Sequence, residues 1–175
     1  ADDFDAAAAG GHANDLDAAG ADLVIANDHK AQLINALEAH IGGTSAPAFE
    51  PTTRPRTEQF LTINGAVTSG RTRGMLQIQD GCDEHCTYCI IPSVRGQSSS
   101  RRADEIIAQA HEMVAAGYRE LALTGVHTGS YGYDLDDQQA LVTLLASLEA
   151  IEGLDRIRLN SIEPGYLSDE LIDFA

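Results

Sequence analysis

Strand and helix patterns alternate along the second half of the chain. Of all features of the sequence, this alternation most strongly limits the folds that the chain can adopt. Apolar runs of strand length occur at residues 74–78, 120–124 and 156–160. Helices with one apolar face are predicted between them, at residues 104–116 and 138–150, and a further helix is predicted to begin at Ser168. Consecutive strand–helix–strand units form right-handed crossovers and a parallel sheet. The sequence therefore predicts an α/β fold.

In a parallel sheet, functional loops lie past the carboxyl ends of the strands. Three loops satisfy this rule here: the segment that follows residue 78, the Gly- and Tyr-rich segment 125–136, and the segment 161–164. We expect all three to converge on one face of the molecule.

The first of these loops contains every cysteine of the chain, Cys82, Cys86 and Cys89, in a C-x3-C-x2-C pattern. Three thiolates on one short loop can hold three irons of a cubane cluster, for which four cysteines are the usual complement. A set of three leaves one iron open for chemistry. A disulfide framework is disfavoured because the count is odd and the chain is not a short, cysteine-dense domain. A zinc site remains the alternative, with His85 as the fourth ligand.

Charge is distributed unevenly. The net charge is −16, but residues 51–102, with seven Arg against four acids, are net positive. The arginines of this segment, which could face an anionic partner or pair with acids elsewhere, are Arg54, Arg56, Arg71, Arg73, Arg95, Arg101 and Arg102. No apolar run approaches the roughly 18 residues that would cross a bilayer. Reduced cysteines and the lack of a signal segment predict no membrane partner and a cytoplasmic location.

Three regions are predicted along the chain. Residues 1–43 contain an Ala- and Asp-rich tail, a short strand at 21–26 and a helix at 29–41, for which Asn27 or Asp28 is a plausible N-cap. Residues 44–58 hold three prolines and resemble a linker. Residues 59–175, with a strand at 59–63, form the second domain. Three later strands do not close a barrel, so we expect the chain to be a portion of a longer protein.

Residues 71 to about 174 resemble the methylthiotransferase branch of the radical S-adenosylmethionine (SAM) superfamily. The motifs that carry the resemblance are Ile78-Gln79-Asp80-Gly81-Cys82, Cys86-Thr87-Tyr88-Cys89-Ile90-Ile91-Pro92, Arg95-Gly96, Ser100-Arg101, Leu123-Thr124-Gly125-Val126-His127, Gly129-Ser130-Tyr131-Gly132, Arg156-Ile157-Arg158-Leu159 and Ser161-Ile162-Glu163-Pro164. The resemblance implies the first half of a radical SAM (β/α) barrel, preceded by the tail end of a small α/β N-terminal domain.

The resemblance also implies the chemistry. Cys82, Cys86 and Cys89 would ligate a 4Fe–4S cluster, and SAM would occupy the open iron. Reductive cleavage of SAM would give a 5′-deoxyadenosyl radical, sulfur would be inserted, and a second SAM would supply the methyl group. Such enzymes carry a second 4Fe–4S cluster in the N-terminal domain, yet no cysteine precedes Cys82. We therefore expect the chain alone to be incomplete as an enzyme. Implied partners are tRNA and an electron donor such as flavodoxin or ferredoxin.

The loop from Thr124 to Gly132 looks most like the enzymes that modify threonylcarbamoyladenosine next to the tRNA anticodon. Relatives that modify isopentenyladenosine in tRNA or a ribosomal protein are the alternatives, as is a non-catalytic metal-binding module.

Further site residues follow from the resemblance. Cofactor contacts are expected from Tyr88, Gly125, Ser161, Glu163 and Arg95. Substrate contacts are expected from His127, Tyr131 and Arg101. Each has an ordinary structural alternative. These are loop packing for Tyr88, a strand-end turn for Gly125, a helix-leading cap for Ser161 and Glu163, exposed loop positions for His127 and Tyr131, and salt bridges for the two arginines. No catalytic acid or base is assigned.

Overall fold

The computed structural model describes residues 32–43, 73–137 and 139–175, together with Asp22, Leu23, Ile25, His29 and Phe60. The tail at 1–20 and the linker at 44–58 lie outside the described residues, as do most residues of the strands expected at 21–26 and 59–63. The division into three regions therefore stays a prediction.

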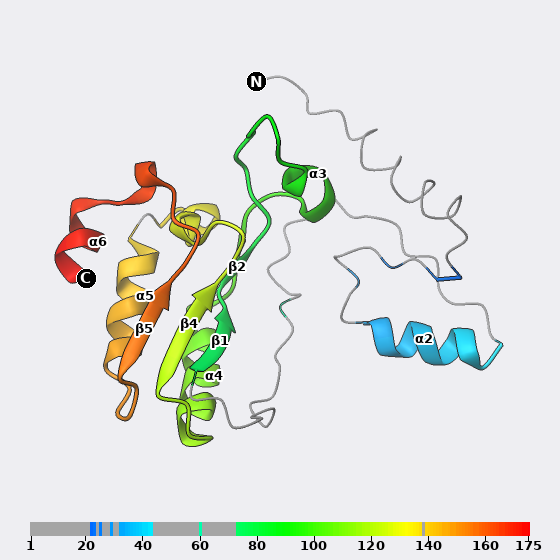
Figure 1. Ribbon diagram of the computed structural model, residues 1–175, viewed down its shortest axis with the longest axis horizontal. Coiled ribbons are helices and arrows are strands. Elements are labelled where there is room, and N and C mark those ends of the chain that lie inside the picture. Colours follow the sequence, from blue (N-terminus) through cyan, green and yellow to red (C-terminus); the bar gives the residue numbers. More distant parts are fainter. Residues whose placement is uncertain are drawn as a thin grey trace.

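A three-stranded parallel sheet forms the centre of the fold (Figure 1). It consists of β1 (Arg73–Gln77), β4 (Glu120–Thr124) and β5 (Arg156–Leu159), in the order β1-β4-β5. Leu76 lies opposite Leu123, and Leu121 lies opposite Ile157. The predicted parallel α/β sheet is confirmed, and it agrees with part of a radical SAM barrel.

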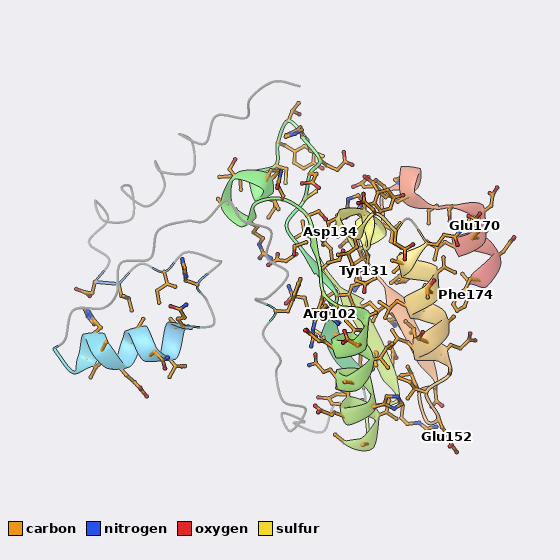
Figure 2. The ribbon with its side chains drawn as sticks, turned by 180° about the vertical axis from the view of Figure 1, so that it is seen from behind. Arg102, Tyr131, Asp134, Glu152, Glu170 and Phe174 are labelled. Carbon is orange, nitrogen blue, oxygen red and sulfur yellow. The ribbon has the colours of Figure 1, made fainter. Side chains whose placement is uncertain are left out.

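Helices α4 (Ala103–Ala115) and α5 (Ala140–Glu149) cover one face of this sheet. Figure 2, seen from the side opposite to Figure 1, shows both helices in front of the strands. The α5 helix buries the leucines that its sequence pattern predicts: Leu141, Leu144, Leu145 and Leu148. A Cβ atom on Gly74 would lie 2.2 Å from Met113 Cε, so α4 packs close to β1 because that position has no side chain.

Helix ends agree closely with the sequence signals. Gly117 follows α4 with a φ of +100°, a conformation in which glycine carries no steric cost. Helix α6 (Asp169–Phe174) begins after Ser168, whose Oγ accepts a hydrogen bond from the Leu171 N–H at 3.2 Å. The predicted start at Ser168 is thereby confirmed as an N-cap.

Short elements that the sequence analysis did not predict surround the cysteine loop. Strands β2 (Gln79–Asp80) and β3 (Ser99–Ser100) form an antiparallel pair, and helix α3 (Ile91–Arg95) lies between them along the chain. Three 3₁₀ turns lie in the loops after β4 and β5: η2 (Thr128–Ser130), η3 (Tyr133–Leu135) and η4 (Pro164–Tyr166). Two-residue strands and single turns are too short to leave a periodic signal.

Helix α2 (Leu33–Ile41) is shorter than the predicted helix at 29–41, and it lies apart from the sheet in Figure 1. Gln32 is its N-cap and makes no side-chain capping bond; the expected caps at residues 27 and 28 lie outside the described residues. Of its residues only Ala36 is buried. The predicted apolar face, Leu33, Ile34, Leu37 and Ile41, is exposed to solvent.

The sheet face opposite α4 and α5 carries charge and one exposed apolar side chain. Met75 is 70% exposed there. Glu120 pairs with Arg73 at 2.8 Å, with Arg158, and with Arg156 at 3.9 Å. Burial by itself would raise the pKa of Glu120, but the hydrogen bonds from Arg158 and the charge of Arg73 lower it below its ordinary value. In the described part of the chain, no helix combines the length and apolar character that crossing a membrane requires.

Candidate iron–sulfur loop and cofactor site

The cysteine loop begins at Gly81, directly after β2, and ends at Gly96, directly after α3. The Cys82 N–H donates to the Gly96 carbonyl at 3.1 Å and closes the base of the loop. Gly81 has a φ of +71°, and a Cβ atom there would lie 1.9 Å from the Gln97 carbonyl oxygen. A glycine is therefore required at this position for both backbone conformation and space.

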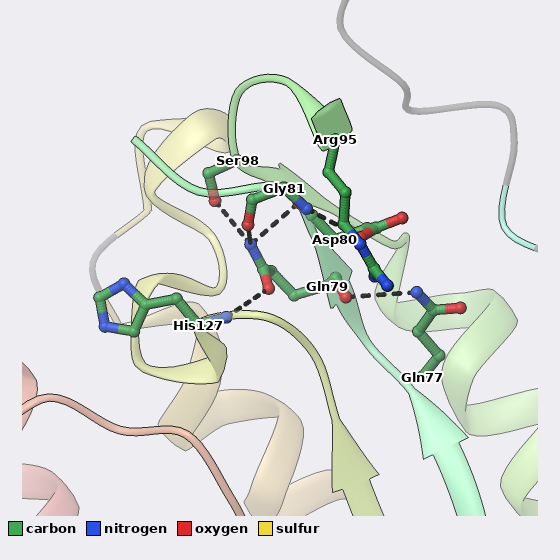
Figure 3. Close-up of polar contacts among 7 residues, drawn as sticks. All are labelled: Gln77, Gln79, Asp80, Gly81, Arg95, Ser98 and His127. Atoms are coloured by element: carbon green, nitrogen blue, oxygen red, sulfur yellow. Dashed lines mark hydrogen bonds and ion pairs between the residues drawn. The ribbon is translucent and has the colours of Figure 1, made fainter. Parts of the chain in front are cut away.

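A buried glutamine, Gln79, holds the base of the cysteine loop to the loop after β4 (Figure 3). The Nε2 of Gln79 donates to the Asp80 carbonyl at 2.9 Å, the Gly81 carbonyl at 2.7 Å and Ser98 Oγ at 3.0 Å. Its Oε1 accepts from the His127 backbone N–H at 2.9 Å. One fully buried side chain thus joins the cysteine loop to the loop after β4.

Arg95 belongs to this same base. Its Nη1 donates to Asp80 Oδ1 at 3.0 Å, and the same oxygen accepts from the Gly81 N–H at 2.9 Å (Figure 3). The Asp80 side chain is buried, whereas that of Arg95 is partly exposed. The structure therefore gives Arg95 the ion-pair role that was its alternative, and its contact with a cofactor stays a prediction.

The three cysteines are free thiols, with Cys86 exposed and Cys82 and Cys89 half-buried. Cys82 Sγ accepts a hydrogen bond from the Glu84 N–H at 3.4 Å. Burial is the main reason that the pKa of Cys82 lies above its ordinary value; the Glu84 N–H opposes this effect, and the charges of Glu84 and Asp83 add to it.

The chemistry of the three thiols fits an iron–sulfur cluster. Cysteine thiolates are the usual ligands of such a cluster, which takes one at each of several irons. Among residues 73–137 and the other described segments, no three His, Cys, Asp or Glu side chains gather closely enough to hold a single metal ion.

The loop after β4 approaches the cysteine loop at Gly125 and His127. A Cβ atom on Gly125 would lie 2.8 Å from Gln79 Oε1, so this glycine allows a close approach within the protein itself. The His127 side chain is buried, at 4% exposure. Its Nε2 makes no hydrogen bond with any described residue. A buried ring nitrogen without a partner marks a place where a ligand atom would be favourable.

Arg101 and Tyr131, expected to meet the substrate, lie instead in the interior, each about 1% exposed. The Tyr131 hydroxyl donates to the Arg101 carbonyl at 2.9 Å. The Arg101 guanidinium donates to Gln109 Oε1 and to the Gln77 carbonyl. Burial, followed by the charge of Asp134, raises the pKa of Tyr131 to about 12. In this arrangement both side chains support the fold, and their burial does not favour a contact with substrate.

The loop after β5 carries Ser161 and Glu163, both exposed. Ser161 has a φ of +55°, a conformation that costs energy in a residue with a side chain and is enriched at functional sites. Tyr88, 89% exposed, lies on the cysteine loop nearby. The negative charge of Cys86 is the main cause that raises the pKa of Tyr88, and that of Glu163 is the next.

Two further contacts complete the convergence of the three loops. Thr128 Oγ1 donates to the Asn160 carbonyl, which joins the loops after β4 and β5. The Tyr166 hydroxyl donates to Glu84 Oε1 at 2.7 Å, which joins the β5 loop to the cysteine loop. The predicted meeting of the three loops is observed. Gln79, Ser98, Glu84 and Tyr166 are site residues that the sequence did not reveal, although Gln79 lies within a motif quoted above.

The family comparison decides between the open alternatives. A model described as "Radical SAM superfamily" matches residues 76–174, which include all three cysteines and all three loops.

The chain belongs to the radical SAM superfamily.

Its similar relatives are methylthiotransferases. It is 49% identical over 104 residues to threonylcarbamoyladenosine tRNA methylthiotransferase MtaB of Bacillus subtilis, covering 59% of this chain and 23% of that protein. It is 40% identical over 117 residues to ribosomal protein uS12 methylthiotransferase RimO of Syntrophomonas wolfei, covering 67% and 27%. It is 38% identical over 136 residues to tRNA-2-methylthio-N(6)-dimethylallyladenosine synthase of Desulfitobacterium hafniense, covering 78% and 29%. The chain thus spans about a quarter of the length of these relatives.

Membership of the radical SAM superfamily implies a 4Fe–4S cluster and SAM as cofactors. In this radical SAM chain, Cys82, Cys86 and Cys89 are the residues that would hold the cluster. The loops after β4 and β5 adjoin the cysteine loop. The Nε2 of the buried His127, which was expected to contact the substrate, has no hydrogen-bond partner among the described residues, so its role stays a prediction.

Proposed function

We propose that the protein is a radical SAM methylthiotransferase that modifies threonylcarbamoyladenosine in tRNA. The observation that carries this proposal is the three-cysteine loop held against the loops after β4 and β5, in a chain whose relatives are methylthiotransferases. The cofactors would supply an electron and a SAM-derived radical for removing hydrogen from an unreactive carbon.

The residues of this chain would bind and orient those cofactors. Cys82, Cys86 and Cys89 would hold three irons and leave the fourth open for SAM. Gln79 fixes the start of the cysteine loop through its bonds to Gly81 and to the His127 backbone, so the cluster would have a constant position relative to the β4 loop. We propose that Tyr88 contacts the SAM adenine and that Ser161 and Glu163 bind its polar groups.

The preference for threonylcarbamoyladenosine is supported by two observations. The loop from Thr124 to Gly132 looks most like that subfamily, and MtaB of Bacillus subtilis is 49% identical to this chain. The uS12 protein and dimethylallyladenosine remain the competing substrates, because the identities overlap: a dimethylallyladenosine synthase of Thermoanaerobacter is 46% identical, and MtaB of Chlamydia pneumoniae is 39% identical.

The proposal that tRNA is the partner rests on the relatives and not on the arginines. Of the seven arginines in the basic segment, the described ones all pair with carboxylates: Arg73 with Glu120, Arg95 with Asp80, Arg101 with Glu105 and Arg102 with Asp104. Arg54, Arg56 and Arg71 lie outside the described residues. We also propose a flavodoxin- or ferredoxin-type electron donor and a cytoplasmic location.

Anaerobic reconstitution with iron and sulfide tests the cofactor assignment. We expect about four irons per chain and a cluster signal that changes when SAM is added. Cys86→Ser should lower the iron content, whereas the neighbouring His85→Ala should leave it unchanged. Uptake of one zinc per chain that is lost in His85→Ala, without iron, would overturn the proposal in favour of a zinc module.

Nucleoside analysis of tRNA tests the substrate assignment. Cells that lack the gene encoding this chain should lose the methylthio group from threonylcarbamoyladenosine and keep it on isopentenyladenosine. Loss of the isopentenyladenosine modification, or of a methylthio group on protein uS12, would assign the protein to the corresponding competing substrate.

A further inference from the structure

We infer that the hydrogen bond between Tyr166 and Glu84 is a latch that positions the cluster-binding loop, and that Tyr166 is a positioning residue of the site. The latch is defined as the bond from the Tyr166 hydroxyl to Glu84 Oε1, 2.7 Å long, between residues 82 positions apart in the chain. The inference rests on the proposed function only in that it takes Cys82 to be a cluster ligand.

Glu84 connects the latch to that ligand. It lies between the first two cysteines, and its backbone N–H donates to Cys82 Sγ at 3.4 Å. Its carboxylate accepts the Tyr166 hydroxyl, and a bond from a hydroxyl to an ionised acceptor is among the stronger hydrogen bonds in proteins. Fixing the side chain of Glu84 restricts its backbone, and so keeps the N–H directed at the sulfur.

Tyr166 is itself held by the loop after β4. Its ring meets the edge of the His127 ring with centroids 4.3 Å apart and planes at 79°, and lies 5.3 Å from the Tyr133 ring. A Cβ atom on Gly129 would come within 2.9 Å of Tyr166 Cβ, so the tyrosine packs directly on that backbone. The latch therefore ends on a packed aromatic group and not on a free side chain.

The latch matters because the other described bonds of the cysteine loop hold only its base. Bonds from the Cys82 N–H to Gly96 and from the Ser98 N–H to Asp83 Oδ1 hold its base. Beyond that base, Cys86 and Tyr88 are exposed. The latch holds the part between base and tip against the β5 loop, where Ser161 and Glu163 lie. It thus sets the cysteines relative to the surface expected to bind SAM.

Hydrogen bonds to cluster sulfurs are one of the factors that set the reduction potential of an iron–sulfur centre. They stabilise the reduced cluster more because it carries more negative charge. If the latch directs the Glu84 N–H at Cys82 Sγ, then removing the latch should make the cluster harder to reduce.

Tyr166→Phe tests this with the loss of one oxygen atom and retention of the ring contacts. In the reconstituted full chain, we expect the midpoint potential of the Tyr166→Phe cluster to be more negative than that of the wild type. Glu84→Gln keeps an oxygen that can accept the tyrosine hydroxyl but removes a negative charge, so its potential should move in the positive direction. A general loss of packing would not give opposite shifts in these two variants.

Amide hydrogen exchange of the metal-free chain gives a second measurement that needs no cluster. The net value of a hydrogen bond to a charged group is about 1.5–3 kcal/mol, so exchange of the hydrogen-bonded amides of Cys82, Glu84 and Cys89 should be about tenfold faster or more in Tyr166→Phe. Tyr133→Phe is the matched control, because it removes a hydroxyl from the adjoining ring that has no described hydrogen bond. Gly129→Ala should also speed exchange by displacing Tyr166, whereas Gly165→Ala, with nothing within 4 Å of the added atom, should not.

Unchanged exchange in Tyr166→Phe would overturn the latch, whether or not a cluster forms. Faster exchange in a chain that takes up no iron would support the latch and contradict the proposed function. Faster exchange with an unchanged potential would also overturn the inference, because Tyr166 would then hold the loop without affecting the sulfur ligand.

Discussion

Replacing Gly81 by alanine should open the base of the cysteine loop. The residue has a φ of +71°, and the added Cβ would lie 1.9 Å from the Gln97 carbonyl oxygen, 2.7 Å from its carbonyl carbon and 2.8 Å from the Gly96 oxygen. These are backbone atoms, which cannot rotate away as the end of a flexible side chain can. The two segments that carry these atoms would have to separate, and they directly adjoin the paired strands β2 and β3, in which Asp80 lies opposite Ser99.

The expected cost has two parts. A left-handed backbone conformation costs a residue with a Cβ about 1–2 kcal/mol. Overpacking against fixed atoms adds about 1–3 kcal/mol, which gives a total loss of about 2–5 kcal/mol in the free energy of unfolding. Gly117→Ala separates these two contributions, because Gly117 also has a positive φ, +100°, but nothing lies within 4 Å of an added Cβ. It should cost only the first part.

Urea unfolding and iron content after anaerobic reconstitution measure the outcome. We expect Gly81→Ala to unfold at lower urea than Gly117→Ala and to bind less iron, because the strain is relieved by breaking the bond from the Cys82 N–H to Gly96. Gly117→Ala should bind iron as the wild type does. Equal unfolding midpoints for the two variants, with full iron content in Gly81→Ala, would refute the reasoning.

Three further changes probe individual contacts. Tyr131→Phe removes the buried hydroxyl that donates to the Arg101 carbonyl at 2.9 Å and should lower the free energy of unfolding by about 0.5–1.5 kcal/mol in urea titration; no loss would contradict the bond. Gln79→Met keeps the volume but removes every polar atom, and should cost at least about 1–3 kcal/mol and reduce iron uptake; a fully stable variant with normal iron would show that the glutamine is not needed. Ser168→Ala removes the cap of α6 and should cost about 1 kcal/mol in thermal unfolding, which Ser168→Asp should restore; an alanine variant as stable as the wild type would contradict the capping role.

The sequence by itself determined those features whose signals are local. The three central strands and α4, α5 and α6 were predicted to within about two residues, because an amphipathic period is carried by neighbouring residues and is read without knowing the partner. Ser168 was predicted as the start of α6 for the same reason, since a cap bonds within its own first turn. The cysteine triplet was equally local: three ligands within eight residues need no folding to bring them together.

The tertiary structure decided what depends on residues far apart in the chain. Arg101 and Tyr131 lie in motifs of the family and were expected to contact the substrate, yet the packed core buries both and supplies their hydrogen bonds. The roles of Gln79 and Tyr166 could not be read locally, although Gln79 lies in a quoted motif, because each role depends on a partner distant in sequence: His127 for Gln79 and Glu84 for Tyr166. Burial and hydrogen bonds between residues distant in sequence depend on which elements pack together. The periodic pattern of apolar residues shows only that an element has a face to bury.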